Sequence, residues 1–394
     1  MTIRTEIVSD FARFATVQPA WQQLWERSGG YIFQSHDWIT GWLTGVEDRK
    51  EIRLQIALAW DGDRLCGALP CAVHRRSGLR VLTWAAQLFS DYCDSLVDPD
   101  YEAAAMLALL WERLRDFGGF DLISLQQIRP DAKCRPLLDQ LATSSSRVQR
   151  DDREERCMRI ENQWRDGEAF FRSLNKKGRN NHTRGKRILS ELGGEVVFRV
   201  VEPPEDGGAL IDELMRLKQV WLRANDPASP LLGPDQVILR SVLDSAWRSG
   251  LATIFALECG GKIAAASFNF VYAGRMEAYF TAYDGAYERA SPGTILIVDY
   301  ARWSFDRGLS HVDFLRGEEA FKFRMANAET VLSSFSGSRT LMGQVAVSGH
   351  RWLARRRQRQ EIVAVVPDEA LDAVGETMPA PSSVAGADSR QPAL

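Results

Sequence analysis

Apolar and polar positions along the chain repeat one arrangement of strands and helices in each half. Residues 52–73 contain two short alternating runs around a turn at Gly62, which predicts a β-hairpin. Residues 251–271 show the same pattern around a turn at Gly260. A further strand, a helix and a last strand then follow in the same order. The repetition predicts two copies of an α/β unit, with chance similarity between generic segments as the alternative.

The helix of each predicted copy leads into a strand. Residues 101–117 have the apolar spacing of a helix and precede FDLISL, and residues 292–307 precede HVDFL. A charged stretch at 144–156 separates the copies, and the end of the chain is rich in Pro, Ala, Ser and Gly without periodicity. We therefore predict an N-terminal domain at 1–155, a C-terminal domain at 156–362 and a disordered tail at 363–394.

Composition argues against several classes of protein. The chain has 394 residues, and its net charge of −3 gives no overall attraction to nucleic acid or anionic membranes. The N-terminus lacks the apolar core of a secretory signal, and no apolar run approaches the ~20 residues of a membrane-spanning helix, so we expect a cytoplasmic location. The six cysteines form no CxxC pair and no zinc-ligand spacing with histidine, so buried reduced thiols and no metal are expected.

The segment YDGAYERASPGTILIVDYARW, residues 283–303, is the strongest candidate for chemistry. Ser291 suits a helix N-cap and Pro292 suits the first helical position. Gly293 has no side chain, so a bulky group can approach the backbone N–H groups of Gly293, Thr294 and the next residue. A helix N-terminus of this kind binds anions and would suit a pyrophosphate. The alternative is that Ser-Pro-Gly serves only as good capping.

The strand before this helix, RMEAYFTAYD, carries polar side chains at period two. Glu277, Tyr279, Thr281 and Tyr283 are expected on one face. That face is either solvated or one wall of an active-site cleft, with Tyr283 at the mouth beside the anion-binding turn.

The stretch DFLRGEEAFKFRM, which begins at Asp313, ends a predicted strand in a cluster of charges. Aspartate is disfavoured inside a strand and unfavourable when buried alone, so Asp313 needs a partner or a task. Arg316 and Lys322 are the available cations. Glu318 and Lys322 are spaced i,i+4 on a predicted helix, in the order that favours an ion pair. The cluster is either a structural set of salt bridges or a catalytic and substrate-holding group.

Two basic runs stand out from the neutral background. Residues 171–189 hold seven Lys and Arg, and HRWLARRRQRQ at 350–360 follows an apolar segment. Solvated helix faces are the usual explanation. The alternatives are binding of a phosphate-bearing ligand or an anionic lipid surface. Specific nucleic-acid binding is not expected, because the first run has one aromatic residue. No GxSxG motif, P-loop or catalytic triad competes with these candidates.

The C-terminal motifs resemble one known family. The sequence SPG-TILIVDYARWSFDRGLSHVDFLRGEEAFKFRM is similar to the acetyltransferase-type domain of the CelD/BcsL family, a branch of the GNAT superfamily. The matching positions are Ser291-Pro292-Gly293, Gly308, Asp313, Arg316-Gly317, the Phe321-Lys322 pair, and the upstream Arg179, Asn180 and Arg184. The resemblance covers residues 165–335 well and the N-terminal half in outline.

The resemblance implies an α+β tandem GNAT (acyl-CoA N-acyltransferase) fold, with two mixed sheets each flanked by helices, as in the FemABX peptidyltransferases. It implies that acyl-CoA lies between two splayed strands with its pyrophosphate on the following helix. The implied cofactor-binding residues are Thr281, Ala282, Tyr283, Ser291, Gly293 and Thr294. YERASPGT stands where GNAT enzymes often have Q/R-x-x-G-x-G/A, which is closer to the FemABX enzymes that use aminoacyl-tRNA.

The leading hypothesis is an acyltransferase that uses acetyl-CoA or a longer acyl-CoA. Asp313, or Glu318 in second place, would remove the proton of the acceptor, and Tyr283 would protonate the departing thiolate. Lys322 and Arg316 would hold the acceptor or steady the base. Arg179 and Arg184, with Arg316, are the candidate anion- and substrate-binding residues.

The acceptor is expected to be an amine or hydroxyl of an envelope or exopolysaccharide precursor, or a lipid amine met by peripheral contact with the membrane. A FemABX-like aminoacyl or peptidyl transferase is the first alternative. A non-catalytic assembly factor for polysaccharide biosynthesis is the second. The N-terminal domain is expected to be structural and to shape the acceptor groove.

Overall fold

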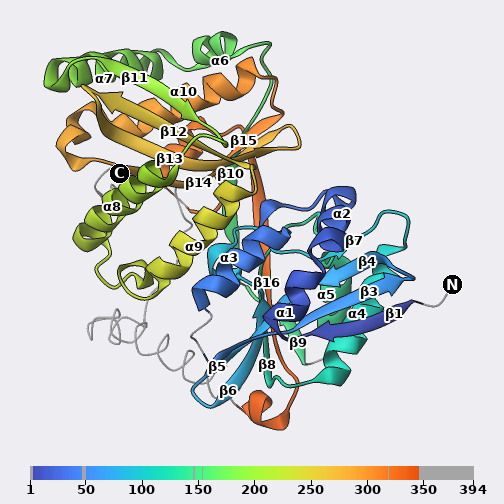
Figure 1. Cartoon of the computed structure of the whole chain (residues 1–394). Coiled ribbons are helices and arrows are strands. Elements are labelled where there is room, and N and C mark those ends of the chain that lie inside the picture. Colours follow the sequence, from blue (N-terminus) through green and yellow to red (C-terminus); the bar gives the residue numbers. More distant parts are fainter. Residues whose placement is uncertain (1–2, 47–49, 145–146, 153, 318, 346–394) are drawn as a thin grey trace, which may run out of the picture.

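The computed structural model describes residues 3–46, 50–144, 147–152, 154–317 and 319–345, whose strands form two sheets (Figure 1). The strands are β1 (Arg4–Val8), β2 (Ile52–Leu54), β3 (Ile56–Asp61), β4 (Arg64–Leu69), β5 (Cys71–Arg76), β6 (Leu79–Trp84), β7 (Leu96–Val97), β8 (Leu122–Ile128), β9 (Val148–Arg150), β10 (Glu155–Glu161), β11 (Val196–Val201), β12 (Ala252–Cys259), β13 (Lys262–Tyr272), β14 (Arg275–Tyr283), β15 (His311–Asp313) and β16 (Ala328–Ser338).

Helices cover both faces of the strands. The α-helices are α1 (Phe11–Thr16), α2 (Gln18–Ser28), α3 (His36–Val46), α4 (Ala103–Phe117), α5 (Arg135–Ser144), α6 (Gly167–Ser173), α7 (Lys176–Gly193), α8 (Gly208–Asn225), α9 (Asp235–Arg248), α10 (Pro292–Asp306) and α11 (Ala320–Met325). Short 3-10 turns are η1 (Ile32–Gln34), η2 (Gln87–Phe89), η3 (Pro230–Leu232) and η4 (Gly285–Ala290). In Figure 1, α7 and α10 lie on one face of β11 to β14, and α8 and α9 lie on the other.

The two halves repeat one strand order. The N-terminal half contains the order β1-β3-β4-β7, and the C-terminal half contains β11-β12-β13-β14. Both predicted hairpins are present: Asp61 pairs with Arg64 around Gly62, and Cys259 pairs with Lys262. Gly62 has a φ of 60°, a left-handed conformation that glycine adopts readily. The predicted α+β fold, with helices flanking mixed sheets, is confirmed.

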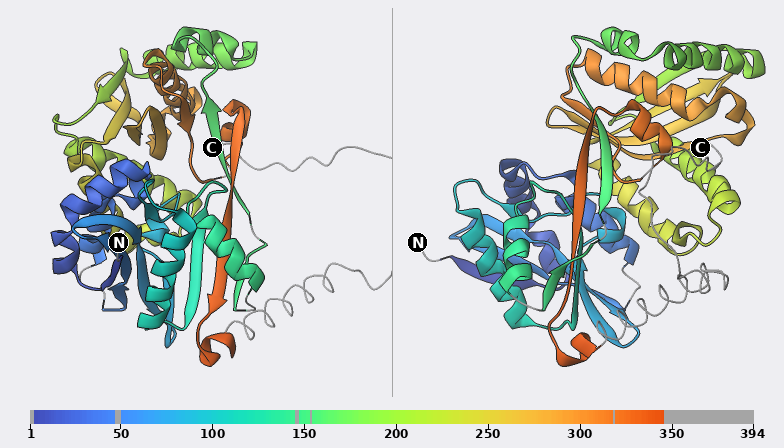
Figure 2. Two further views of the ribbon diagram at one scale, coloured as in Figure 1. Left: turned by 90° about the vertical axis from the view of Figure 1, so that its right-hand side faces the viewer. Right: turned by 180° about the vertical axis from the view of Figure 1, so that it is seen from behind.

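One long sheet joins the halves, which the sequence did not predict. Strand β16 pairs with β10 through residues 328–332, then with β8 and β9 through residues 333–338. The right-hand view of Figure 2 shows β16 and β10 side by side where the halves meet. The predicted division at residues 155/156 falls at the start of β10, but β16 crosses it. The described residues therefore form a four-stranded sheet and a twelve-stranded sheet in place of two similar ones.

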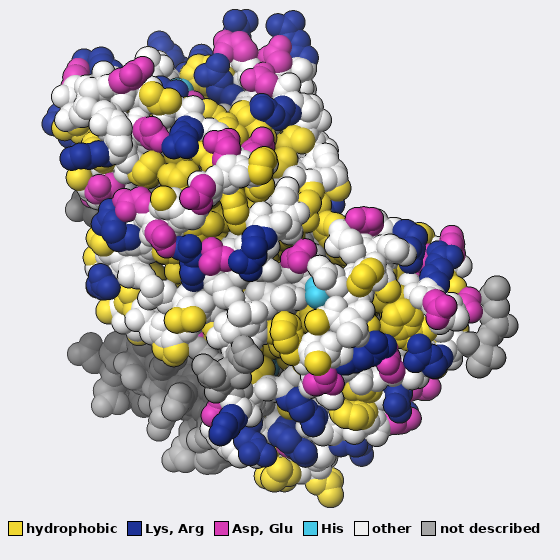
Figure 3. All heavy atoms as spheres, in the orientation of Figure 1, with side chains coloured by type: hydrophobic (Ala, Val, Ile, Leu, Met, Phe, Trp, Pro, Cys, Tyr) yellow, Lys and Arg dark blue, Asp and Glu magenta, His cyan; other side chains and the backbone are white. Residues whose placement is uncertain are grey.

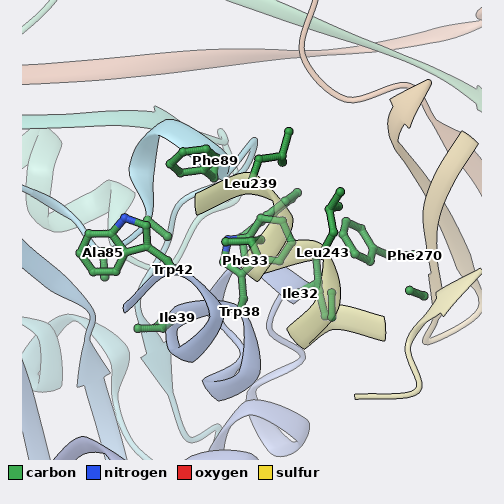
Figure 4. Close-up of a cluster of buried hydrophobic side chains, with 14 of the residues drawn as sticks. Ile32, Phe33, Trp38, Ile39, Trp42, Ala85, Phe89, Leu239, Leu243 and Phe270 are labelled. Atoms are coloured by element: carbon green, nitrogen blue, oxygen red, sulfur yellow. The ribbon is translucent and has the colours of Figure 1, made fainter. Parts of the chain in front are cut away.

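Hydrophobic contacts also cross between the halves. The indole rings on α3 are buried with side chains of α9 and of β13 in one core (Figure 4). Helices α3 and α9 approach closely, because a Cβ added at Gly41 would lie 2.7 Å from Ser245 Cβ and one at Gly45 would lie 2.6 Å from Ile238 Cα. Two glycines one helical turn apart therefore set the separation of these helices. Trp38 and Trp42 on α3 are both buried in this core.

Several predicted boundaries were wrong. The predicted strand HVDFL ends at Asp313, and Leu315 has a φ of 54°, so the chain turns before the predicted strand is complete. Helix α11 begins at Ala320, with Glu319 as its N-cap. The basic run at 171–189 is divided between α6 and α7. All six cysteines are free and buried, as predicted. Glu318, the run at 350–360 and the tail at 363–394 lie outside the described residues.

Candidate active site

Strands β14 and β15 are parallel and separate soon after they meet. Met276 pairs with Val312 and Glu277 with Asp313, and β15 ends there. From residue 278 onward, the edge of β14 that faces β15 has no strand partner among the described strands. An open edge leaves main-chain donors and acceptors free to bind an extended ligand.

A β-bulge sets which amides reach this open edge. Phe268 opposes Phe280 on β14 while Asn269 opposes Ala278, so Tyr279 is the extra residue. Beyond the bulge, the N–H of Asp284 donates to Ala264 O on the β13 side, at 2.9 Å. N–H groups alternate in direction along a strand, so those of Thr281 and Tyr283 point to the open edge, and that of Ala282 points to β13.

The N-terminus of α10 lacks a side-chain cap. Ser291 is the N-cap residue, as predicted, but it has a φ of 55° and its side chain makes no capping hydrogen bond. The N–H groups of Thr294 and Ile295 both donate to Ser291 O, at 3.1 and 3.2 Å. Pro292 has no N–H. Of the amides predicted to be accessible, that of Gly293 alone lacks a partner within the described part of the chain.

The end of β14 and the start of α10 share one corner. A Cβ built at Gly293 would meet one neighbour, Tyr283 Cδ1, at 3.7 Å, so there is room above the first turn. Tyr283 is half-buried, and this burial together with the nearby Glu288 raises the pKa of its hydroxyl. The Thr281 hydroxyl is bonded to Ser267 Oγ at 2.8 Å, so its backbone amide rather than its side chain is available.

Helix α7 lies against the start of α10. A Cβ at Gly185 would be 2.6 Å from Ala290 O, which brings the helices into close contact. His182 Nε2 and Lys186 Nζ each lie 2.8 Å from the carboxylate of Asp299, which is on α10. Burial alone would raise the pKa of Asp299, but the histidine hydrogen bond and the lysine charge keep it below its ordinary value. These contacts hold a basic helix beside the N-terminal turn of α10.

The two arginines predicted on α7 have different environments. Arg179 donates to the carbonyls of Arg172 and Leu174, so it closes the end of α6. Arg184 is exposed and has no ion-pair partner among the described residues. Figure 3 shows Lys and Arg side chains along the upper edge of the molecule, where Figure 1 places α6 and α7. Arg184 is therefore the better placed of the two to meet an anion.

Asp313 links the two halves. Its side chain is 2% exposed, and it accepts hydrogen bonds from Tyr92 Oη at 2.7 Å and from Leu315 N at 2.8 Å. Both carboxylate oxygens are therefore occupied. This geometry favours a positioning role over the predicted removal of a proton.

The predicted cations are also engaged. Arg316 Nε donates to Glu155 Oε2 at 2.7 Å. Lys322 is buried, lies 3.0 Å from Glu319 Oε2 and donates to the carbonyl of Arg316. Its described acidic partner is thus Glu319, one position beyond the glutamate that was predicted. These contacts hold the turn after β15 in shape.

Two side chains near the point where β14 and β15 separate were not predicted from the sequence. Asp91 comes from the N-terminal half and lies 3.8 Å from Arg316 Nη1. Lys218 on α8 lies over the rings of Trp221 and Phe280, and burial lowers the pKa of its ammonium group. Neither residue belongs to a recognisable motif, because tertiary contacts alone bring them to β14.

Two other kinds of site are absent from the described residues. No group of three or more His, Cys, Asp or Glu side chains is arranged to hold a metal ion there. Within the same part of the chain, no helix combines the length and the apolar character needed to cross a bilayer.

Comparison with known proteins agrees with this geometry. Residues 176–323 match the family model described as an acetyltransferase (GNAT) domain. No curated protein matches the chain. Among solved structures, FemX is 10% identical with a TM-score of 0.55, over 85% of this chain and 97% of that one. The C-terminal domain (DUF2156) of a putative lysylphosphatidylglycerol synthetase from Agrobacterium fabrum is 12% identical with a TM-score of 0.50, over 85% of this chain and 94% of that one.

At these identities the solved structures establish the fold. The family match agrees with two features of the structure, the strand order that the halves share and the separation of β14 from β15. Residues 176–323 form a GNAT-superfamily acetyltransferase domain, and the chain is an acyltransferase by class.

Proposed function

We propose that the chain is a CelD/BcsL-like acyltransferase that uses acetyl-CoA or a longer acyl-CoA. It would transfer the acyl group to an amine or hydroxyl of an envelope or exopolysaccharide precursor, or to a lipid amine. One observation carries the proposal: the open edge of β14 meets the uncapped N-terminus of α10 at a single corner, between Tyr283 and Gly293.

The residues at this corner fit the parts of CoA. The N–H of Gly293 and the positive end of the α10 dipole would hold the pyrophosphate. Arg184 would add a positive charge, because it is next to Gly185, where α7 contacts the residue before Ser291. The free amides of Thr281 and Tyr283 would hold the extended pantetheine arm and the thioester carbonyl. When bound, CoA supplies the activated acyl group, and the protein supplies position and electrostatic field.

The protein's own groups would then assist transfer. The N–H groups of Thr281 and Tyr283 would donate to the carbonyl oxygen as it gains negative charge. The Tyr283 hydroxyl, whose pKa is raised, stays protonated at neutral pH and would give its proton to the departing thiolate. Arg316 and Lys322 would keep the turn after β15 in place beside the acceptor.

Titration of CoA, acetyl-CoA and a long-chain acyl-CoA in a calorimeter tests the proposal. Micromolar dissociation constants are expected for all three. Pantetheine, which lacks the diphosphate, is the matched control and should bind at least tenfold more weakly, since it loses the contacts with α10. The absence of binding by every CoA species would overturn the proposal.

A lipid acceptor would require contact with a membrane from the cytoplasmic side. The motivating feature is the basic run at 350–360, which lies outside the described residues. Flotation with anionic liposomes, compared between the natural chain and one with Arg355, Arg356 and Arg357 reversed to glutamate, separates the acceptor classes. Equal failure of both proteins to float would favour the polysaccharide precursor.

Aminoacyl transfer is the second candidate, and the exposed basic surface of α7 is the observation that favours it. A chain that binds tRNA and not CoA would be this kind of transferase. An assembly factor without catalysis, the remaining alternative, would bind CoA without ever releasing its thiol.

A further inference from the structure

Hydrogen bonds hold residues 90–95 of the N-terminal half close to the point where β14 and β15 separate. Immediately before this segment, Phe89 O accepts a hydrogen bond from Tyr279 Oη at 2.8 Å, and Tyr279 is the bulged residue of β14. Within it, Tyr92 Oη donates to Asp313, the last residue of β15, at 2.7 Å. Ser90 and Asp91 lie between these two anchors. The N-terminal half therefore delivers one carboxylate to the place where the two strands separate.

We propose that Asp91 is the catalytic residue that takes the proton from the acceptor during acyl transfer. This role rests on the proposed function. It assigns to the N-terminal half a chemical task in addition to shaping the acceptor groove.

Two of the other nearby carboxylates are already occupied, and a third, Glu277, is fully buried. Asp94 accepts from the backbone N–H groups of Ser95, Lys133 and Cys134, at 2.7 to 2.9 Å. Asp313 accepts two hydrogen bonds, as described above. Among the residues that the structure describes, Asp91 accepts no hydrogen bond, and its ion-pair partner is Arg316 at 3.8 Å. Its oxygens are therefore free to accept a proton.

The exposure of Asp91 and the pKa of its carboxyl both suit the removal of a proton from the acceptor. The Asp91 side chain is 16% exposed, so it is enclosed yet reachable. Burial raises the pKa of its carboxyl to about 6, against the opposing charges of Arg316 and Lys322, while Asp313 and Glu155 add to the rise. Such a group is mostly ionised at neutral pH and is a stronger base than an ordinary aspartate. Glu155 remains paired with Arg316 when Asp91 becomes neutral.

The step conserves atoms and charge. The lone pair of the acceptor nitrogen or oxygen forms a bond to the thioester carbonyl carbon, and the acceptor proton passes to Asp91. The carbon–sulfur bond breaks, and the sulfur leaves with its electron pair and takes a proton from Tyr283. Asp91 then returns its proton to water through its exposed face, and the Tyr283 hydroxyl is reprotonated from water.

Thiol release by the full-length chain tests the role, with acetyl-CoA as donor and glucosamine or octylamine as model acceptor. Asp91→Asn should lower kcat by 100-fold or more, leave the Kd for CoA within about twofold and keep Tm unchanged. The natural chain should lose kcat/KM below a pKa near 6, and the variant should lack this limb. Asp100→Asn, an exposed carboxylate of the same half, is the matched control and should behave as the natural chain.

The possible outcomes distinguish failure of the Asp91 assignment from failure of the proposed function. If the natural chain transfers the acyl group and Asp91→Asn keeps its rate and its acid limb, Asp91 is not the base, although the proposed function stands. If Asp91→Asn also loses CoA binding or thermal stability, its role is structural. If the natural chain binds no CoA and releases no thiol, both proposals fall.

Discussion

Replacing Gly293 by aspartate would separate the stability of α10 from the binding of its ligand. A Cβ at this position meets Tyr283 Cδ1 at 3.7 Å and nothing else within 4 Å, and the backbone is not left-handed, so a side chain fits. A carboxylate in the first turn of a helix is stabilising by about 0.3–1 kcal/mol. Gly293→Asp should therefore leave Tm unchanged or slightly higher.

The same carboxylate would repel a diphosphate at this turn. Two unit charges about 5 Å apart repel by roughly 1–3 kcal/mol for effective dielectric constants between about 80 and 20. A loss of about 2 kcal/mol corresponds to a roughly 30-fold rise in the Kd for CoA. Stability and affinity are thus expected to change in opposite directions, which general damage to the fold would not produce.

Calorimetric titration with CoA at low and high salt measures the effect. Gly293→Ala tests the added Cβ, and Gly293→Asn matches the size of aspartate without its charge. Alanine should stay within about threefold of glycine, and the gap between Asn and Asp should narrow at high salt because screening shortens the range of the repulsion. Equal CoA affinities for the Asn and Asp variants at low salt would show that the diphosphate does not lie at α10.

Three further predictions concern one buried carboxylate of β14 and two contacts that join the halves. Burial raises the pKa of Glu277 from 4.5 to about 7. Between these pH values the native state binds more protons than the unfolded state, so the free energy of unfolding falls as pH rises. Glu277→Gln should flatten this dependence, which urea titrations at pH 5 and pH 8 would measure. Tyr92→Phe should lower the free energy of unfolding by about 1–3 kcal/mol, since it leaves buried Asp313 with one partner, and an unchanged urea midpoint would contradict this. Gly45→Leu should lower Tm by several degrees because its Cβ would meet the α9 backbone, whereas Gly285→Ala, which points into open space, should not.

Local patterns predicted the elements that carry local signals. The hairpin turns at Gly62 and Gly260 and the start of α10 at Pro292 each depend on a few adjacent residues with fixed conformational preferences. The crossing of β16 between the halves depends on which distant strand it pairs with, and residues 328–338 alone do not encode that choice. The fold of each half was therefore predictable, and their fusion into one sheet was not.

In the candidate site too, contacts between residues far apart in the sequence were not predicted. The reasoning that Asp313 needs a partner was sound, but the partner is Tyr92, which lies 221 positions away in the chain. Asp91 could not be singled out, because its enclosed position depends on the anchors at Phe89 and Tyr92. Sequence motifs singled out the helix that would hold the donor, whereas the proposed base, Asp91, depends on tertiary contacts.

The two halves share a strand order but differ at the place where a donor would bind. In the C-terminal half, β15 meets only the start of β14 and leaves the rest of that edge open. In the N-terminal half, β8 is not in the sheet of β7, and it pairs in parallel with β6 of the inserted hairpin β5–β6.

The helix starts differ as well. At the N-terminus of α4, the carboxylate of Glu102 accepts from the N–H groups of Ala104 and Ala105, at 2.9 and 2.6 Å. The turn that corresponds to the N-terminal turn of α10 is therefore already occupied by a negative charge. A diphosphate would have to displace Glu102 and overcome its charge to bind there. If the proposed function holds, the C-terminal copy would bind the donor at this corner, and the N-terminal copy would complete its acceptor side through Asp91.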